Sequence, residues 1–395
     1  MKVAFSMSKK TTRSRMVIDD MRISFSIVFY FCALITNYTV KHVLDLESPL
    51  VRAQTSAIFM MVVGLVFIIN LPRVFRRIGF FFLSSFLLAG SVFLLNILLF
   101  PSNIEYLLDA AFWFFFICLP LFLYYHAIYD RMLFLELLVK SAYYQIALGI
   151  VFLLTTNLAT PVYDMVYSYL VLVPVILLIY KMFNQFKLID LVLSMAGIIA
   201  TVILGSRGPL VSILVFSVTL LISRAFELHA KSLLIFIVAL VLLGFVFVNL
   251  DLVLEFINSI LVKHGISSRT IKLLMYRDTI DFSTGRNILF ETTIEKIKEN
   301  PYFGYGLAGD RLFLNGTYPH NIVLEIVAQL GLVMGLIVLV ILLFLWLKPI
   351  ISSVDRVDRD LALIFFALGL VPLFMSGSYL TSGNFWIFMA ICSSI

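Results

Sequence analysis

Long apolar runs alternate with short polar connections along most of the chain. A membrane-spanning helix needs about 20 mostly apolar residues, with a range of about 17 to 25. The pattern predicts roughly twelve such helices, at residues 23–40, 55–71, 78–100, 107–125, 141–156, 163–180, 188–205, 209–223, 232–250, 322–347, 361–375 and 384–395. The last run is short and is expected to be a partial or tilted span.

One polar segment, residues 251–321, interrupts this pattern. It starts with an apolar-periodic stretch, 252–262, which predicts a helix lying in the membrane interface. A second helix is expected after Ser283 or Thr284, either of which can cap it, and it should end at Asn300 because Pro301 cannot continue a helix. The glycines of residues 302–309 then permit a tight turn.

The predicted fold class is therefore all-α, a polytopic integral membrane protein with one large external loop segment. Four parts are expected along the chain: a basic N-terminal segment 1–22, spanning helices 23–250, the external segment 251–321 and spanning helices 322–395. The first apolar run is too long for the hydrophobic region of a typical signal peptide, so it is expected to be retained as a span.

Composition excludes a water-soluble fold. Of the 395 residues, 62% are hydrophobic and only 13% are charged, whereas a soluble domain has about 45–50% apolar residues and about 25% charged ones. The three cysteines, Cys32, Cys118 and Cys392, lie inside apolar runs without the spacing of a disulfide framework or a zinc site.

The net charge of +6 comes from basic residues scattered between apolar runs. Scattered cations do not form a nucleic-acid footprint, so no nucleic-acid partner is expected, and contact with anionic membrane lipid accounts for them better. Positively charged loops stay in the cytoplasm. Most Lys and Arg residues fall on one side if the N-terminus is inside, and an even number of spans then places the C-terminus in the cytoplasm as well.

Arg207 is the first candidate functional residue. It lies in Gly205-Ser206-Arg207-Gly208-Pro209, between two apolar runs. An arginine at membrane depth costs about 2.5–3.5 kcal/mol on insertion scales, so its presence needs a reason. It either extends its charge to the outer interface, or its planar guanidinium holds a phosphate bidentately while the flanking glycines let a headgroup approach.

Arg286, in Gly285-Arg286-Asn287, is expected at the start of the external helix. A cation is poorly placed at a helix N-terminus, whose amides and dipole favour anions. Arg286 is therefore either an ordinary solvated arginine or a second phosphate ligand that converges with the helix amides on one anion. Arg277 and Arg311 are weaker candidates for the same role.

His320, in Tyr318-Pro319-His320-Asn321, lies where the external segment re-enters the membrane. With an ordinary pKa near 6.5, a histidine can take a proton from a hydroxyl at neutral pH. Asn321 can cap the following helix, and Glu325 is a candidate to orient the histidine. The acidic and histidine residues lack metal-ligand spacing, so neither a metal nor another cofactor is expected.

These motifs resemble the O-antigen ligase and polymerase superfamily, which includes the Wzy-type polymerases and the lipopolysaccharide O-antigen ligases. The resemblance covers residues 200–345 and rests on order and spacing. Its motifs are Gly205-Ser206-Arg207-Gly208-Pro209-Leu210, Gly285-Arg286, Asn300-Pro301-Tyr302-Phe303-Gly304-Tyr305-Gly306, and Pro319-His320-Asn321-Ile322-Val323-Leu324-Glu325 followed by Gly331 and Gly335.

The resemblance implies a GT-C-like membrane glycosyltransferase in the bacterial inner membrane. Its donor would be an oligosaccharide repeat unit on undecaprenyl diphosphate, and its acceptor another glycan at the outer face. Arg207 and Arg286 would hold the diphosphate, with Arg311 and Arg277 as further candidates, and His320 would be the catalytic base. Ser206, Gly208, Asn321 and Glu325 would support the site.

Two other functions are left open by the sequence. A ligase would transfer the finished polymer to the lipid A core, whereas the hairpin and re-entry motifs look slightly more like those of a polymerase. A transporter or flippase for a lipid-linked substrate would place charges within the spans, where this chain has few. A chain-length regulator is a candidate partner of a polymerase.

Overall fold

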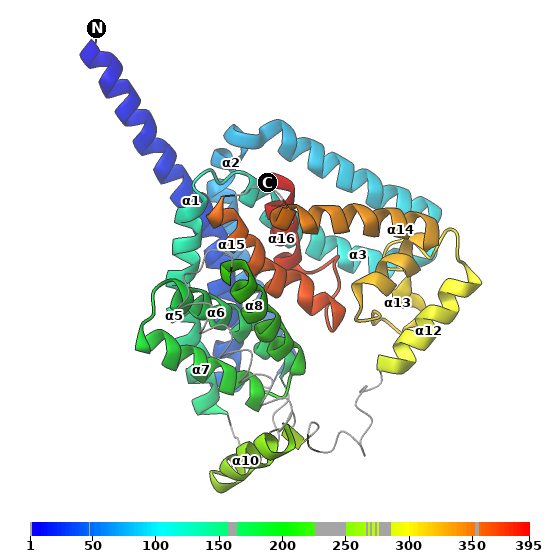
Figure 1. Cartoon of the computed structure of the whole chain (residues 1–395). Coiled ribbons are helices and arrows are strands. Elements are labelled where there is room, and N and C mark those ends of the chain that lie inside the picture. Colours follow the sequence, from blue (N-terminus) through cyan, green and yellow to red (C-terminus); the bar gives the residue numbers. More distant parts are fainter. Residues whose placement is uncertain are drawn as a thin grey trace. The chain divides into compact units, whose positions relative to one another are not determined.

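The chain folds into α-helices joined by short turns (Figure 1). A computed structural model describes residues 2–46, 48–156, 164–225, 250–265, 268, 271, 272, 275, 286–351 and 355–395. The helices in these ranges are α1 (Lys2–Val43), α2 (Pro49–Leu99), η1 (Pro101–Asn103), α3 (Ile104–Trp113), η2 (Phe114–Cys118), α4 (Leu119–His126), α5 (Arg131–Thr155), α6 (Met165–Asn184), α7 (Leu188–Ile203), α8 (Arg207–Ala225), α10 (Leu250–Lys263), α12 (Arg286–Glu299), α13 (Asp310–Phe313), α14 (Ile322–Ile351), α15 (Arg356–Phe365), η3 (Phe366–Leu370), η4 (Val371–Phe374) and α16 (Gly383–Ser394).

Seven helices in the described ranges are long and apolar enough to cross a membrane. Together with the helical content, they confirm the predicted all-α, polytopic membrane fold. Two shorter apolar helices, α7 and α16, coincide with the predicted runs 188–205 and 384–395. The predicted span 232–250 lies almost wholly outside the described residues, and the total of twelve stays a prediction.

The chain divides into two compact units, each built from separate stretches of sequence. The first unit comprises residues 1–31, 57–138 and 285–395, and the second comprises residues 32–56 and 139–284. The polar segment 251–321 is shared between them, because its first part belongs to the second unit and its last part to the first. Each unit is described separately.

Helix α2 joins two predicted spans, 55–71 and 78–100, without a loop. Its backbone leaves the helical region at Ile78 alone (φ −134°, ψ 28°). At a rise of about 1.5 Å per residue, 51 residues extend about 75 Å, more than twice the roughly 30 Å hydrocarbon core of a bilayer. A bend is therefore needed, and it comes at the start of the second predicted span, next to the basic stretch that contains Arg73 and Arg77.

Ion pairs fix the bend of α2 to α1 and to the end of α4. Arg77 Nη1 lies 2.6 Å from Asp20 Oδ1 and donates to the Ala127 carbonyl at 2.7 Å. Arg73 Nε lies 3.2 Å from Asp19 Oδ1. Nearby, Arg131 pairs with Asp358. These polar contacts link α1, α2 and the end of α4 to one another, and the start of α5 to α15, within the first unit.

In the second unit, α6 packs against both α7 and α8. Glycines allow close approach, since a Cβ at Gly197 of α7 would overlap Val175 of α6, and one at Gly208 of α8 would overlap the Tyr169 hydroxyl. Lys181 pairs with the fully buried Asp190 at 3.3 Å, with Tyr143 bonded to the same carboxylate. A paired charge costs less to bury than an isolated one.

Helix α14 is broken at Gly331 (φ 75°, ψ 172°), and the loop after α12 fills the break. In an unbroken helix the Leu332 N–H would bond the Ala328 carbonyl. Instead, the Leu332 N–H donates to the Pro301 carbonyl at 2.6 Å, and the Ala328 carbonyl accepts from the Tyr305 N–H at 2.9 Å. The Gln329 carbonyl accepts from the Gly306 N–H at 2.8 Å. The broken helix and the loop therefore exchange backbone partners.

The glycines of this loop are required by close backbone contact. Gly304 has φ +65°, and a Cβ there would lie 2.5 Å from the Gly331 nitrogen. Two buried asparagines hold the next residues: Asn96 Oδ1 accepts from the Leu307 N–H at 2.7 Å, and Asn103 Nδ2 donates to the Tyr305 carbonyl. Of residues 302–309, expected only to form a tight turn, residues 304 and 306–309 are thus buried in the first unit, whereas Tyr302 and Phe303 are exposed.

We expect Gly304→Ala to lower the thermal unfolding midpoint of the detergent-solubilised protein. The new methyl group would meet backbone atoms that cannot move aside, at a left-handed φ that costs about 1–2 kcal/mol for a residue with a Cβ. Gly90→Ala is the matched control, because nothing lies within 4 Å of a Cβ there, and alanine should stabilise that helix by about 0.5–1 kcal/mol. Equal midpoints for the two variants would contradict the backbone exchange.

Candidate functional site

Arg207 begins α8 on the tight hairpin that the sequence predicts. Helix α7 ends at Ile203, Gly205 takes the left-handed conformation (φ 77°), and α8 starts two residues later. The hairpin is held from outside, since the Ser268 hydroxyl donates to the Val202 carbonyl at 2.8 Å and the Asp164 N–H donates to the Leu204 carbonyl at 3.1 Å.

The two supporting residues of the hairpin flank Arg207 closely. Ser206 is buried, and Gly208 lies directly against Tyr169, so any side chain at position 208 would displace that ring. These three residues belong to the second unit of the fold.

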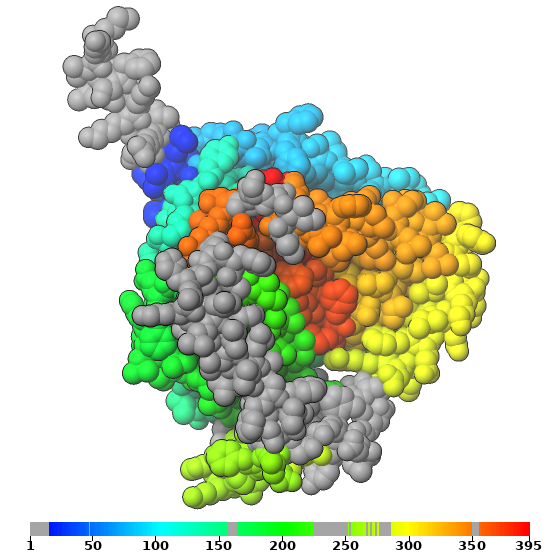
Figure 2. All heavy atoms as spheres, in the orientation of Figure 1, coloured from blue at the N-terminus to red at the C-terminus, as the bar shows by residue number. Residues whose placement is uncertain are grey.

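Arg286 is the first residue of α12, which ends at Glu299 as predicted. The helix packs against α14 through a small apolar cluster of Ile297, Val327 and Ala328. In the space-filling view, the yellow surface that includes α12 adjoins the orange surface of α14 (Figure 2; labels in Figure 1). The expected caps Ser283 and Thr284, and the candidate Arg277, lie outside the described residues.

His320 stands immediately before α14 in a strained backbone conformation. Its φ of +56° is left-handed, which is uncommon for a residue with a side chain. Its ring packs edge-on against Tyr318, with 4.6 Å between ring centroids. Asn321 caps α14 as predicted, because its Oδ1 accepts from the Val323 and Leu324 N–H groups at 3.0 and 3.2 Å. The cap fixes the point from which the imidazole projects.

Arg286 and His320 are brought together within the first unit. Burial, and then the positive charge of Arg286, lower the pKa of His320 to about 4. The imidazole is therefore neutral at pH 7 and able to accept a proton. Its Nδ1 is buried and has no hydrogen-bond partner among the described residues. A buried polar atom without a partner is uncommon and calls for an explanation such as a bound group.

A connected series of hydrogen bonds between largely buried side chains lies next to this segment. The Arg311 Nη2 donates to Ser378 Oγ at 3.3 Å, and Ser378 Oγ donates to Glu325 Oε1. The Tyr379 N–H donates to Glu325 Oε2 at 3.4 Å, and its hydroxyl donates to Gln329 Oε1 at 2.6 Å. Gln329 Nε2 completes the set by donating to Asp310 Oδ1 at 2.7 Å. We call these six residues the buried polar ring.

The buried polar ring joins α13, the first two turns of α14 and the loop before α16. It holds one guanidinium and two carboxyl groups, so Arg311 offsets charge that burial would otherwise penalise. Burial raises the pKa of Asp310 above its usual range, while Arg311 acts in the opposite direction. Arg311 is only 5% exposed, with its guanidinium 5.9 Å from the Tyr318 ring. Its Nη1 is buried without a hydrogen-bond partner among the described residues.

The structure thus groups Arg286, His320, Asn321, Arg311 and Glu325 in the first unit. Glu325 bonds Ser378 and Tyr379, and through them it supports the loop before α16. The sequence analysis did not single out the other members of the buried polar ring: Asp310, Gln329, Ser378 and Tyr379. A signal existed for Gln329, which lies four residues after Glu325 and so shares its helix face.

Within the described ranges, no group of three or more His, Cys, Asp or Glu side chains could hold a metal ion.

We expect Arg286→Gln to raise the pKa of His320, because removing a nearby cation favours the protonated imidazole. The titration can be followed by NMR of histidine-labelled protein in nanodiscs, with His320→Gln assigning the signal. Lys298→Gln makes the same charge change on the exposed side of α12 and should leave the pKa in place. If the pKa of His320 does not change in Arg286→Gln, the charge of Arg286 does not act on His320.

We expect Arg311→Ala to destabilise the protein by about 3–5 kcal/mol, because it leaves two buried carboxyl groups without their cation. The loss should shrink as the pH falls, since the carboxyls then take up protons. Arg76→Ala removes a half-exposed surface ion pair with Asp19 and should cost at most about 1 kcal/mol. Denaturant titrations at pH 5 and pH 8 measure both. A loss no larger than that of Arg76→Ala would argue against the ring.

Comparison with known proteins identifies one family. Residues 191–340 match the model of the O-antigen ligase family, a range that contains the hairpin of Arg207, α12, the glycine loop and the first part of α14. No curated protein and no solved structure matches the chain. The match coincides closely with the region of motif resemblance, and this domain supports membership of the O-antigen ligase and polymerase superfamily.

Proposed function

We propose that this chain is a membrane glycosyltransferase that polymerises oligosaccharide repeat units carried on undecaprenyl diphosphate, at the outer face of the bacterial inner membrane. The superfamily supports ligase- or polymerase-type transfer between lipid-linked glycans in general. The proposed mechanism is supported chiefly by one observation: a neutral, partly buried His320 lies close enough to Arg286 for the positive charge to lower its pKa.

The proposed reaction is a direct displacement. An acceptor hydroxyl oxygen attacks the anomeric carbon of the donor sugar, and the bond from that carbon to the diphosphate oxygen breaks with inversion. The electron pair leaves with the diphosphate, and the hydroxyl proton passes to His320. A fixed guanidinium stabilises the charge that develops on the leaving group, as positioned cations do in phosphoryl chemistry. No step calls for a metal ion.

The low pKa of His320 suits this role once a diphosphate is bound. A base with a pKa near 4 is always free to accept a proton at pH 7, but it accepts one weakly. An anion beside Arg286 would cancel the charge that contributes to the low pKa, so the imidazole becomes more basic only when the donor is present. Substrate binding and base strength are thereby linked.

Arg207 is the second proposed diphosphate ligand. It begins a helix, where the amides and dipole also favour an anion. Ser206 and Gly208 support the hairpin, and Gly208 lets its first turn pack directly against Tyr169. Arg311 stays a weaker candidate, because its guanidinium is largely committed to the buried polar ring. Asn321 and Glu325 support the site by fixing the start of α14 and the loop before α16.

A ligase that transfers the polymer to the lipid A core is the second candidate. The matching family model is described as an O-antigen ligase, which favours it. The same arginines and histidine would serve both reactions, since the two differ in the acceptor and share the donor. The polymerase proposal rests on the motifs at residues 205–210 and 319–325.

We expect Arg207→Ala, Arg286→Ala and His320→Ala each to abolish glycan transfer while the protein still accumulates in the membrane. Arg207→Lys should rescue poorly, because an ammonium cannot match the bidentate geometry of a guanidinium. Transfer from a purified lipid-linked donor is the measurement, and Lys298→Ala on the exposed face of α12 is the control. Wild-type rates in all three alanine variants would refute the mechanism, and loss of transfer in EDTA would refute metal independence.

The loss-of-function phenotype separates the two acceptors. Cells that still attach single repeat units to the core have lost a polymerase, whereas cells that accumulate unattached lipid-linked polymer have lost a ligase. The polymerase proposal requires the first outcome, and the second would assign the ligase reaction to the same site. Unchanged glycans with slower translocation of the lipid-linked unit would indicate a transporter instead.

A further inference from the structure

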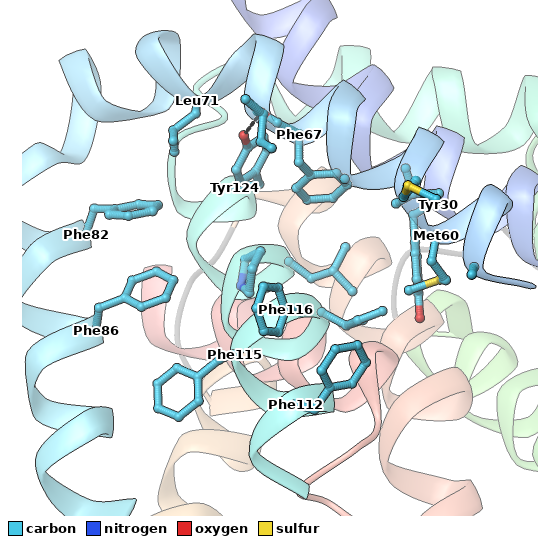
Figure 3. Close-up of a pocket in the computed structure, with 18 residues that line it drawn as sticks. Tyr30, Met60, Phe67, Leu71, Phe82, Phe86, Phe112, Phe115, Phe116 and Tyr124 are labelled. Atoms are coloured by element: carbon cyan, nitrogen blue, oxygen red, sulfur yellow. Dashed lines mark hydrogen bonds between the residues drawn. The ribbon is translucent and has the colours of Figure 1, made fainter. Parts of the chain in front are cut away.

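A partly open apolar cavity of about 620 Å³ lies in the first unit, between the two arms of α2 and the α3–η2–α4 segment (Figure 3). Its volume is within the range of about 300–1,000 Å³ usual for ligand pockets. None of the 18 lining residues is charged. The residues come from both sides of the bend at Ile78, so the angle of α2 creates the space.

Aromatic rings form much of the cavity wall. Phe82, Phe86, Phe112, Phe115 and Phe116 face the space in the close-up (Figure 3). The Tyr124 hydroxyl donates to the Phe67 carbonyl and is thereby satisfied. The wall therefore suits a hydrocarbon ligand.

The cavity lies at membrane depth, because the lining residues of α2, α3 and α4 all belong to helices long and apolar enough to span a bilayer. A hydrocarbon chain that moves from the bilayer into such a cavity gains little hydrophobic free energy, since lipid tails are themselves apolar. Selective binding must then come from packing and shape. Aromatic rings around the space favour a stiff chain with methyl branches and double bonds, because it contacts the rings well and loses little freedom on binding.

The cavity wall is continuous with the core that carries the glycine loop. Phe82, Phe86 and Phe115 pack against the buried cluster that contains Leu307 and Ala308. Those two residues follow the backbone exchange at Gly331 directly. A chain in the cavity would therefore pack against the same core that positions the segment leading to His320.

We propose that this cavity holds the isoprenoid chain of the lipid-linked donor. The proposal rests on the proposed function for the identity of the donor and adds a binding site for its lipid part. The cavity would anchor the chain within the membrane while the headgroup reacts at the outer boundary.

Gly64 offers a direct test, because it lines the cavity and nothing lies within 4 Å of a Cβ built there. We expect Gly64→Trp to fill the space and raise the KM for a full-length polyprenyl-diphosphate donor at least about tenfold, with kcat nearly unchanged. A donor with two isoprene units does not need the cavity, so its kcat/KM should change less than about twofold.

Gly90→Trp is the matched control. Gly90 lies on the same helix with equally open space around a Cβ, but it does not line the cavity. Both donors should be used normally by this variant. Gly64→Leu repeats the test with a smaller side chain, and the unfolding midpoint of each variant shows whether it folds. The proposal would be overturned if the folded Gly64→Trp protein lost activity equally with both donors. It would also be overturned if the variant used both donors as well as the wild type does.

Photolabelling tests the cavity independently of glycan transfer. A diazirine-bearing polyprenyl phosphate in nanodiscs should label residues 57–71, 82–86 and 112–124 of the wild-type protein, and Gly64→Trp should reduce this labelling while Gly90→Trp does not. Equal labelling by a diazirine-bearing phosphatidylglycerol would show a general lipid site and overturn the choice of an isoprenoid. If the wild type labels as expected but transfers no glycan, the proposed function fails and the cavity proposal survives.

Discussion

The exchange of backbone hydrogen bonds at Gly331 is the constraint on which the candidate site depends. A helix entering a membrane cannot leave its carbonyls unpaired, because no water is present to satisfy them. Here the Ala328 and Gln329 carbonyls accept hydrogen bonds from the N–H groups of Tyr305 and Gly306. In return, the Leu332 N–H donates to the Pro301 carbonyl of the loop. The chain can therefore break α14 at membrane depth and still satisfy these groups.

The position of residues 310–320, between the loop and α14, depends on this exchange. Residues 310–320 start from the fixed loop and end at the Asn321 cap, so both ends of the segment bearing His320 are held. The buried polar ring adds a third attachment, to the loop before α16. A histidine in a left-handed conformation persists only where its surroundings over-determine it, and these three attachments do so.

The sequence predicted the helices and individual residues better than their assembly. Apolar run length is set by the bilayer, so spans such as 165–184 were found, and α12 was found because a proline ends it. The joining of two spans at Ile78 was missed, because Pro72, the following arginines and Gly79 indicate a loop, whereas the helix continues through them. The exchange at Gly331 and the contacts of Asn96 with Leu307 link residues far apart in the chain, which periodicity alone does not reveal.

The bend of α2 has a consequence for the membrane around the protein. Its apex is fixed to α1 by ion pairs, whereas its two arms carry many exposed apolar side chains that face lipid. A thicker or thinner bilayer is accommodated by tilting apolar helices, and tilting the arms about a fixed apex changes the width between them. The volume of the cavity is then set by lipid composition as well as by sequence. The same protein would have a cavity of different width in membranes of different thickness.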